Sequence, residues 1–188
     1  QTLLIASSNP GKLREMQYIL HGLPLRLVLP IDVGIQLDVL EDGDSYLANA
    51  QKKALAYQHA SGLLTLADDS GLAVDALDGA PGIISARFSP KAGANDADRR
   101  AYLLQKLAAH PQPWTAHFHC SLVLASPQGA QYHFSAKCFG QIIAEERGDN
   151  GFGYYPIFFM PALGKTMAEL PDQHKNQISH RALALLAA

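Results

Sequence analysis

Charged side chains, cysteines and aromatic residues are all scarce in this chain of 188 residues. Charged residues make up 17% of the sequence and the net charge is −2, so electrostatics give no reason to expect a nucleic-acid or anionic-membrane partner. No apolar run is as long as a membrane span, and no signal peptide with a basic and then an apolar segment opens the sequence. We therefore expect a cytoplasmic protein that binds neither nucleic acid nor membrane.

Cysteine is limited to Cys120 and Cys138, and both lie in apolar, strand-like surroundings. Neither belongs to a CxxC pair or to a Cys/His spacing typical of zinc sites. We therefore expect two reduced, buried thiols. Apolar residues, in contrast, make up 48% of the sequence, which is enough for a substantial core and indicates one globular domain over residues 1–188.

The spacing of apolar residues predicts both strands and helices. The predicted elements are strands at 2–7, 25–30, 63–67 and 72–77, helices at 46–60 and 96–110, a helix that begins near Pro10, and a helical C-terminal tail. Two long strands, "WTAHFHCSLVLAS" and "AQYHFSAKCFGQIIAEE", are joined at "PQG" in the pattern of a β-hairpin. Because helices alternate with strands and an antiparallel pair stands among them, the sequence predicts an α/β fold with a mixed sheet.

Polar residues gather after the apolar strands, where α/β sheets bind their ligands. The stretch "SSNPGK" (7–12) stands at the start of a predicted helix, where backbone N–H groups, hydroxyls and Lys12 can bind a phosphate. It lacks the spacing of a Walker loop. An ordinary turn with a solvated lysine is therefore an equally good interpretation of this stretch alone.

A second polar stretch, "LEDGDSYLANAQKKA" (40–54), surrounds the start of the next predicted helix. Glu41 precedes this helix, while Asn49 and Lys53 lie four residues apart and so share one of its faces. Acidic residues near a helix N-terminus are often simply solvated and favoured by the helix dipole. Taken alone, this stretch favours that structural interpretation.

The most informative stretch is "LADDSGLAVDALDGAPGIISARFS" (66–89). Its apolar strand ends in Asp68 and Asp69, followed by a predicted tight turn at Ser70 and Gly71. Two adjacent carboxylates repel each other, so we expect a retained proton or a bridging cation. Oxygen ligands suit Mg²⁺ best, and Glu41 can complete such a site. The alternative is that one of the acids only caps the turn.

Two further stretches, "GDNGFGYYP" and "KNQISHR", follow later in the chain. Glycines flank Phe152, which suits a loop where an aromatic ring faces a flat ligand. Ser179 is predicted to cap the last helix, which would place His180 and Arg181 beside free N–H groups that suit an anion or a carbonyl-rich base. The alternative for Lys175 and Arg181 is a surface position.

His117 and His119 lie two residues apart on a predicted strand and therefore share one of its faces. No third metal ligand is indicated near them. Half-buried strand histidines are the better interpretation of this pair.

Together and in this order, the four polar stretches resemble the inosine triphosphate pyrophosphatase family, also described as noncanonical purine nucleoside triphosphate (dITP/XTP) pyrophosphatases. "SSNPGK" is similar to the family's [ST]-x-N-x-G-K opening, and "ADDSGLAVDALDGAPGIISARFS" resembles its most diagnostic run. "GFGYYPIF" and "ISHR" are similar to its GFGYDPIF and SHR. The resemblance extends from Leu3 to about Leu186.

The resemblance implies an elongated α/β/α fold with a mixed sheet and a nucleotide cleft between two lobes, usually in a homodimer. It also implies an enzyme that hydrolyses purine nucleoside triphosphates such as ITP, dITP and XTP to the monophosphate and pyrophosphate with Mg²⁺, and so cleanses the nucleotide pool. A pyrophosphatase for other modified nucleotides and a non-catalytic nucleotide-binding module are the alternatives.

The resemblance implies roles for individual residues as well. Glu41 and Asp69 would bind Mg²⁺, and Asp69 would also be the general base. Asp68 and Lys53 would assist catalysis. The residues implied to bind the substrate are Ser7, Ser8, Asn9, Pro10, Gly11, Lys12, Ser70, Phe152, Gly153, Tyr154, Tyr155, Lys175, His180 and Arg181.

Two positions depart from the family pattern. Tyr155 stands where the family usually has the Asp of GFGYD, in the region implied to contact the base. Ala48 stands where the family's helix often reads ENA, although Glu41 is retained. We therefore expect any effect of these departures to concern base preference and a contact near the metal.

Overall fold

The structure, a computed structural model, describes residues 1–188. The chain divides into two compact units, residues 1–70, 120–136 and 180–188 in the first and residues 71–119 and 137–179 in the second. Seven strands form one sheet in the order β2-β1-β3-β4-β5-β6-β7. The predicted α/β fold with a mixed sheet is confirmed. A single domain, an elongated shape and a cleft between lobes stay predictions.

The first unit contains the parallel part of the sheet. Its elements are β1 (Thr2–Ile5), α1 (Pro10–Ile19), β2 (Arg26–Val28), α2 (Tyr46–Ser61) and α5 (His180–Leu186), together with part of β3 (Leu64–Val74), β4 (Trp114–Ala125) and β5 (Gln131–Ile142). β1 lies between β2 and β3 and is parallel to both. Central parallel strands are covered on both faces, which explains their nearly unbroken apolar sequences.

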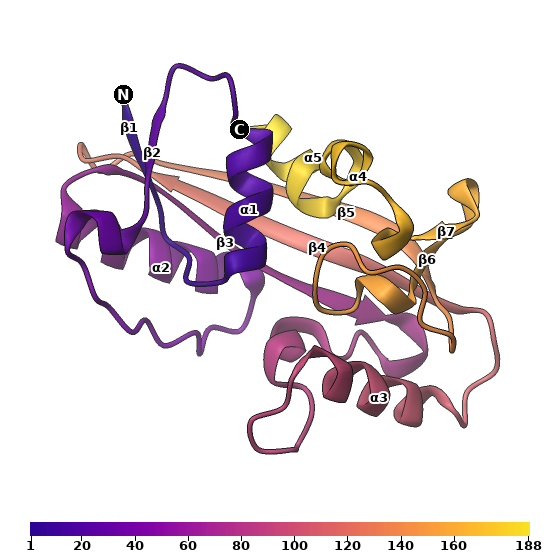
Figure 1. The fold of residues 1–188 in the computed structure, drawn as a ribbon. Helices are drawn as coiled ribbons and strands as arrows, with labels where there is room; N and C mark the ends of the chain where they lie inside the picture. The colour runs from indigo at the N-terminus through magenta and orange to yellow at the C-terminus, as the bar shows by residue number, and fades with distance from the viewer. The chain divides into compact units, whose positions relative to one another are not determined.

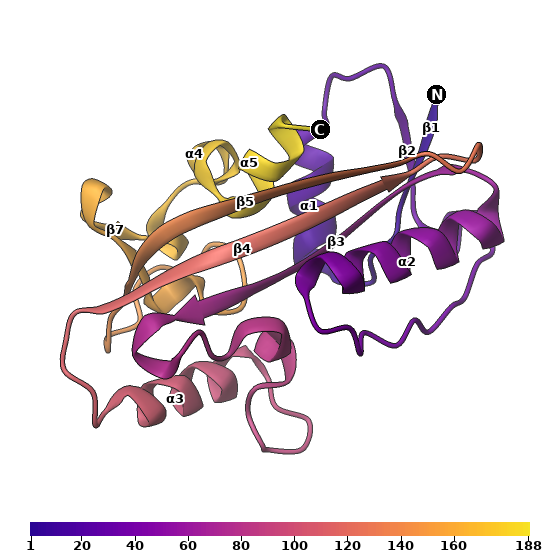
Figure 2. The ribbon, with the colours of Figure 1, turned by 180° about the vertical axis from the view of Figure 1, so that it is seen from behind.

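Helices cover both faces of the sheet in the first unit. On one face, Ala50 and Ala54 of α2 pack in a cluster that includes Ala67 of β3. On the other face, Met16 of α1 and Ala184 of α5 belong to the cluster of the neighbouring strand residue, Leu66. Figures 1 and 2 show α1 and α5 side by side although they come from opposite ends of the chain. β3 is therefore enclosed between α2 and the α1–α5 pair.

The second unit has an aromatic core. Its further elements are α3 (Asp96–Leu107), β6 (Phe158–Met160), β7 (Lys165–Thr166) and α4 (Asp172–Ile178). β5, β6 and β7 are antiparallel neighbours. Leu103 of α3 packs with Trp114, Phe118, Tyr155 and Phe158 in one buried cluster. This core positions the loop that carries Tyr155.

Several local predictions are confirmed. Helix α1 begins at Pro10, and the Ser45 hydroxyl caps α2 by accepting a hydrogen bond from the N–H of Ala48. β4 and β5 are adjacent in the sheet and joined by a short loop, as the hairpin requires. Cys120 and Cys138 are buried, free thiols. None of the helices combines the length and the apolar composition needed to cross a membrane.

One prediction around the paired acids is wrong. The sequence predicts separate strands at 63–67 and 72–77 joined by a tight turn, but residues 64–67 and 72–74 belong to one strand, β3, with Ser70 and Gly71 within it. Residues 75–77 form a 3-10 helix instead. A glycine's preference for turns is weak compared with hydrogen bonding to neighbouring strands and burial on both faces. The two acids therefore lie in the middle of a strand and not at its end.

Candidate active site

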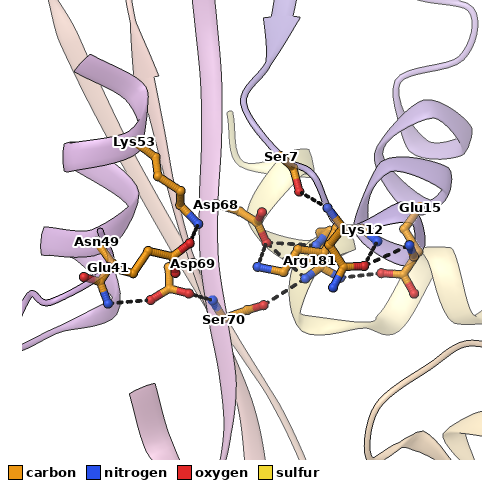
Figure 3. A network of polar contacts seen from close by, with 12 residues as sticks. Ser7, Lys12, Glu15, Glu41, Asn49, Lys53, Asp68, Asp69, Ser70 and Arg181 are labelled. Carbon is orange, nitrogen blue, oxygen red and sulfur yellow. Dashed lines mark hydrogen bonds and ion pairs between the residues drawn. The ribbon is translucent and has the colours of Figure 1, made fainter. Parts of the chain in front are cut away.

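Asp68 and Asp69 point to opposite faces of the sheet, because successive side chains of a strand alternate. Asp68 lies on the side of α1 and α5, and Asp69 lies on the side of α2 (Figure 3). Their exposed fractions are 0% and 5%. The interpretation that the two carboxylates face each other across one bridging cation is therefore corrected. Each acid has its own set of partners.

Asp68 is held by two cations. Its Oδ2 atom accepts hydrogen bonds from Nε and Nη2 of Arg181, at 3.1 and 3.0 Å, and lies 3.1 Å from the ammonium nitrogen of Lys12. Burial alone would raise the pKa of Asp68, but Lys12 and Arg181 more than offset it and hold that pKa well below its usual range. The other oxygen, Oδ1, is buried and has no hydrogen-bond partner. Asp68 is thus an ionised group with one uncommitted oxygen.

Glu15 is a member of this network that none of the sequence motifs includes. Its Oε2 accepts a hydrogen bond from Nη1 of Arg181, whose Nη2 also donates to the Ser70 hydroxyl at 2.9 Å. Glu15 and Arg181 are 4% and 0% exposed. The only signal in the sequence is that Glu15 follows Lys12 by three residues on the same helix face. Its burial depends on α5, at the far end of the chain.

Asp69 is bonded at both of its oxygens. The side-chain amide of Asn49 donates to Oδ2 at 3.0 Å, and the backbone N–H of Ser70 donates to Oδ1 at 2.9 Å. Burial raises the pKa of Asp69 above its ordinary value, despite the opposing charges of Lys12 and Lys53. The two neighbouring acids therefore differ: Asp68 is held ionised, and Asp69 has the higher affinity for a proton.

Lys53 and Glu41 form an ion pair on the Asp69 side. The ammonium nitrogen of Lys53 donates to Oε1 of Glu41 at 2.9 Å, and Lys53 is 9% exposed. Burial alone would lower the pKa of Lys53, but the carboxylates of Asp68, Glu41 and Asp69 raise it above its ordinary value. Lys53 therefore remains a cation beside the paired acids.

In the loop before α1, several of the backbone N–H groups that could bind a phosphate are already bonded to side chains of the loop. The carboxamide oxygen of Asn9 accepts from the N–H groups of Gly11 and Lys12, at 2.9 and 3.2 Å, and so caps the helix. The Ser7 hydroxyl accepts from the N–H of Asn9 at 3.2 Å. These three N–H groups are already bonded, and Lys12 supplies the one cationic side chain that residues 7–12 can present to a phosphate.

Ser7 and Ser8 also line a pocket of about 580 Å³. The rest of its lining is mostly apolar and consists of Leu13, Leu29, Pro30, Ile31, Ile35, Gln36, Leu37, Asp38 and Tyr57. Such surroundings do not suit a highly charged polyphosphate. We therefore expect a triphosphate to lie against the polar network and not in this pocket.

The acids of the network suit a divalent cation that takes few protein ligands. No group of three or more histidine, cysteine, aspartate or glutamate side chains is arranged to hold a metal. Glu41 lies close enough to Asp69 to raise the pKa of its carboxyl group. Mg²⁺ is commonly bound through one or two carboxylates, with water and substrate phosphates as the other ligands. Glu41 and Asp69 fit that pattern.

The second unit brings three of the predicted base-contacting residues together. The ring centroids of Phe152 and Tyr155 are 5.3 Å apart, and the Lys175 ammonium lies 5.9 Å from the centroid of the Tyr155 ring. Lys175 also bonds Asp172 at 2.5 Å. Tyr155 is only 1% exposed and packs edge-on against Phe118. Tyr155 is therefore a residue of the hydrophobic core of the second unit.

The loop that carries these residues is anchored to α3. The N–H of Gly153 donates to Asp96 and its carbonyl oxygen accepts from Arg100, both at 2.8 Å. Gly151 has φ +85°, and a Cβ atom there would lie 2.3 Å from the Tyr155 ring. Only glycine fits this position without strain. The Tyr154 hydroxyl donates to a backbone carbonyl at 2.8 Å, so this side chain too is fixed.

The structure therefore gathers the predicted residues in two groups. The first unit brings together Ser7, Lys12, Glu41, Lys53, Asp68, Asp69, Ser70 and Arg181 (Figure 3). His180 is buried and precedes Arg181 in α5. Ser8, Asn9, Pro10 and Gly11 belong to the loop and first turn beside this group. The second unit holds Phe152, Gly153, Tyr154, Tyr155 and Lys175. Their individual roles stay predictions.

Comparison with known proteins gives one consistent result. The sequence profile of the Ham1 family matches residues 3–188. A dITP/XTP pyrophosphatase of Geobacter sulfurreducens is 49% identical over 98% of this chain and 94% of its own length. One of Geobacillus kaustophilus is 43% identical over 97% of this chain and 90% of its own length.

Solved structures agree. A HAM1 protein from Coxiella burnetii is 40% identical and has a TM-score of 0.89, with 99% of this chain and 95% of that chain covered. The Ham1 protein of Staphylococcus aureus is 36% identical with a TM-score of 0.87, covering 100% and 95%. These relatives are named dITP/XTP pyrophosphatases, which is the family that the sequence motifs resemble. The resemblance is therefore confirmed. The chain belongs to the Ham1 family.

Proposed function

We propose that this chain hydrolyses deaminated purine nucleoside triphosphates, such as ITP, dITP and XTP, to the monophosphate and pyrophosphate. The observation that carries the proposal is the pair of neighbouring acids on opposite faces of β3, whose pKa values are shifted in opposite directions, with the half-buried cation Lys12 and the buried cation Lys53 beside them. Groups whose pKa values are pushed apart are typical of catalytic sites. The dITP/XTP pyrophosphatases among the relatives support the choice of substrate.

The side chains of the first unit divide the work of binding and proton transfer. A triphosphate carries several negative charges, which Lys12 and Lys53 are placed to neutralise. Asp69, with its raised pKa, takes the proton of the attacking water, since a general base works best when its pKa approaches the working pH. Asp68 stays ionised and keeps Lys12 and Arg181 in place.

Glu41 and Asp69 would hold Mg²⁺ in this scheme. Bound Mg²⁺ would supply positive charge against the polyphosphate and favour loss of a proton from the attacking water. Attack at the α-phosphorus breaks its bond to the bridging oxygen and releases pyrophosphate. Lys12 meets the negative charge that develops on this leaving group, as preorganised donors do in other hydrolases.

Base choice depends on the group at position 6 of the purine. Inosine and xanthosine carry an oxygen there, whereas adenosine carries an amino group. A donor such as Lys175 or His180 that faces this position satisfies the oxygen but remains unpaired against the amino group, which is costly in a buried site. Arg181 already donates to Asp68, Glu15 and Ser70, so contact between its guanidinium and the base requires a further N–H.

A substrate panel tests the proposal. We expect Mg²⁺-dependent pyrophosphate release with kcat/KM about 100-fold higher for inosine and xanthosine triphosphates than for adenosine triphosphate. Guanosine triphosphate and modified pyrimidine triphosphates complete the panel. A preference for the pyrimidines would favour the alternative pyrophosphatase, and tight nucleotide binding without pyrophosphate release would favour the non-catalytic module.

The family resemblance also leads us to propose a cytoplasmic homodimer. Light scattering coupled to size-exclusion chromatography measures the mass in solution directly. A mass of twice the chain's 20.3 kDa supports the dimer, and a mass of one chain contradicts it.

A further inference from the structure

The side chain of Asn49 in α2 is bonded to both candidate metal-binding regions. It contacts the segment that carries Glu41, and it contacts Asp69 directly. Asn49 is fully buried. Its Oδ1 accepts a hydrogen bond from the N–H of Gly43 at 2.8 Å. Its Nδ2 donates to Oδ2 of Asp69 at 3.0 Å (Figure 3). Gly43 follows Glu41 by two residues. Asn49 therefore ties the segment of Glu41 to the carboxylate of Asp69.

The chemistry of the two partners fixes the orientation of this amide. A backbone N–H can only donate, and an ionised carboxylate can only accept. Rotating the Asn49 amide by half a turn would set its NH₂ group against the Gly43 N–H and its oxygen against the Asp69 carboxylate. Both contacts would be repulsive in a buried site. Asn49 therefore has one stable orientation, in which both bonds form together.

The Gly43 segment is packed tightly against the start of α2. A Cβ atom at Gly43 would lie 2.8 Å from Oδ1 of Asn49 and 2.9 Å from the Cβ atom of Ala48. The φ of Gly43 lies outside the left-handed region, so the glycine serves close approach and not an unusual backbone conformation. Helix capping does not account for Asn49, because Ser45 supplies the N-cap of α2.

We propose that Asn49 is a positioning residue that fixes the separation of Glu41 and Asp69, and so sets the affinity of the site for its divalent cation. The inference rests on the proposed function, which assigns these two acids to Mg²⁺. Groups that orient metal ligands from behind typically change metal affinity or activity 10- to 100-fold when they are removed. Asn49 donates to Oδ2 of Asp69. It would therefore influence the bound cation by orienting this ligand.

The test compares three alanine variants. Asn49→Ala removes both hydrogen bonds, and Gly43→Ala pushes the Glu41 segment away while Asn49 can still donate to Asp69. Ser45→Ala is the matched control, because it weakens the start of the same helix without touching the carboxamide. For Asn49→Ala we expect the Mg²⁺ concentration that half-saturates ITP hydrolysis to rise about 10-fold or more. Gly43→Ala should raise it by a smaller factor.

A second readout does not depend on turnover. Mn²⁺ binding is measured by electron paramagnetic resonance in the presence of ITP that carries a non-cleavable imido group between the α- and β-phosphates. Mn²⁺ affinity should fall in the order Ser45→Ala, Gly43→Ala, Asn49→Ala. Affinity for the analogue without metal should change less than about threefold. Ser45→Ala should lower the melting temperature but keep the Mn²⁺ affinity of the unmodified chain.

The outcomes separate this inference from the function on which it rests. Absence of ITP hydrolysis by the unmodified chain contradicts the proposed function. Normal hydrolysis with unchanged Mg²⁺ and Mn²⁺ affinities in Asn49→Ala contradicts the positioning role alone. If Asn49→Ala does not fold, Gly43→Ala decides: lower metal affinity than in Ser45→Ala supports the role, and equal affinity overturns it.

Discussion

At the scale of single residues, the site depends on the different surroundings of two adjacent acids, Asp68 and Asp69. Asp68 faces Lys12 and Arg181 and keeps its charge, whereas Asp69 faces an amide and binds a proton more readily. The strand supplies this difference without any special geometry, since alternation alone sends the two side chains to opposite faces. One acid can therefore organise cations while the other exchanges a proton.

The charge of Asp68 should be visible in the pH dependence of stability. Its pKa is lower in the folded protein than in the unfolded chain, so its ionised form stabilises the fold above about pH 4, and this contribution is lost as the pH falls through the folded pKa. Asp68→Asn removes the carboxylate that pairs with Lys12 and with buried Arg181, and it should lower the free energy of unfolding by about 3 kcal/mol at pH 7.

Urea unfolding at several pH values measures this effect. The difference between the unmodified chain and Asp68→Asn should shrink below about pH 4. Asp149→Asn, at an exposed position, is the control and should change little. A difference that stays constant from pH 7 to pH 3 would contradict the assigned pKa direction.

Tyr155 belongs to the core of the second unit and stands where the family pattern has an aspartate. Tyr155→Asp removes a buried ring from Phe118 and Phe152, and we expect it to cost about 3 kcal/mol of stability. The new carboxylate would stand near Lys175 and offer an acceptor to a ring N–H, so the preference for inosine triphosphate should become sharper. Tyr155→Phe keeps the ring and is the control for packing. Identical kinetics for Tyr155→Asp across all purine triphosphates would show that the departure has no effect on specificity.

At the scale of elements, one side chain fastens α5 to α1 and β3. Arg181 donates to Glu15 of α1 and to Asp68 and Ser70 of β3. A lysine keeps the charge but lacks the planar fork that reaches several acceptors at once. The docking of α5 therefore depends on the shape of the guanidinium as well as on its charge.

Hydrogen exchange measures this docking. Arg181→Lys should leave Glu15 with a poorer partner and lower the free energy of unfolding by about 3 kcal/mol. Amide protection should fall most in α5, whereas α2, which packs on the opposite face, should keep its relative protection. Equal loss of protection in both helices would argue against this docking role.

The limits of sequence reasoning also become clear at this scale. Helices α1, α2 and α3 were predictable because apolar spacing and caps such as Ser45 are local signals. Helix α4 was missed, because it has seven residues and no side-chain cap at Pro171. β3 was divided in two, because Ser70 and Gly71 resemble a turn when the neighbouring strands are unknown.

At the scale of the whole molecule, the family motifs predicted which residues form the site better than they predicted how these residues are arranged. They named Glu41, Lys53, Asp68 and Asp69, which the fold does bring together. They did not indicate Glu15, whose partner lies 166 residues away in the sequence. Nor did they show that the acids face opposite ways, since that follows from an unbroken strand. A local sequence pattern carries no information about which distant residues or strands pair with each other.

Removing the metal should leave the fold intact. Each acid of the network already has a protein partner: Lys12 for Asp68, Lys53 for Glu41 and Asn49 for Asp69. We therefore expect EDTA to abolish turnover while shifting the melting temperature by no more than about 2 °C, with activity restored by Mg²⁺. Loss of the near-ultraviolet circular dichroism signal in EDTA would show that the cation is structural.

The most direct test of the account is the rate of pyrophosphate release from inosine triphosphate by Asp69→Asn. The substitution keeps the shape of the side chain but removes the group that accepts the proton of water. The account predicts a fall of about 100-fold or more in the presence of saturating Mg²⁺, with an unchanged far-ultraviolet circular dichroism spectrum. Turnover close to that of the unmodified chain would remove Asp69 from the mechanism and contradict the central claim.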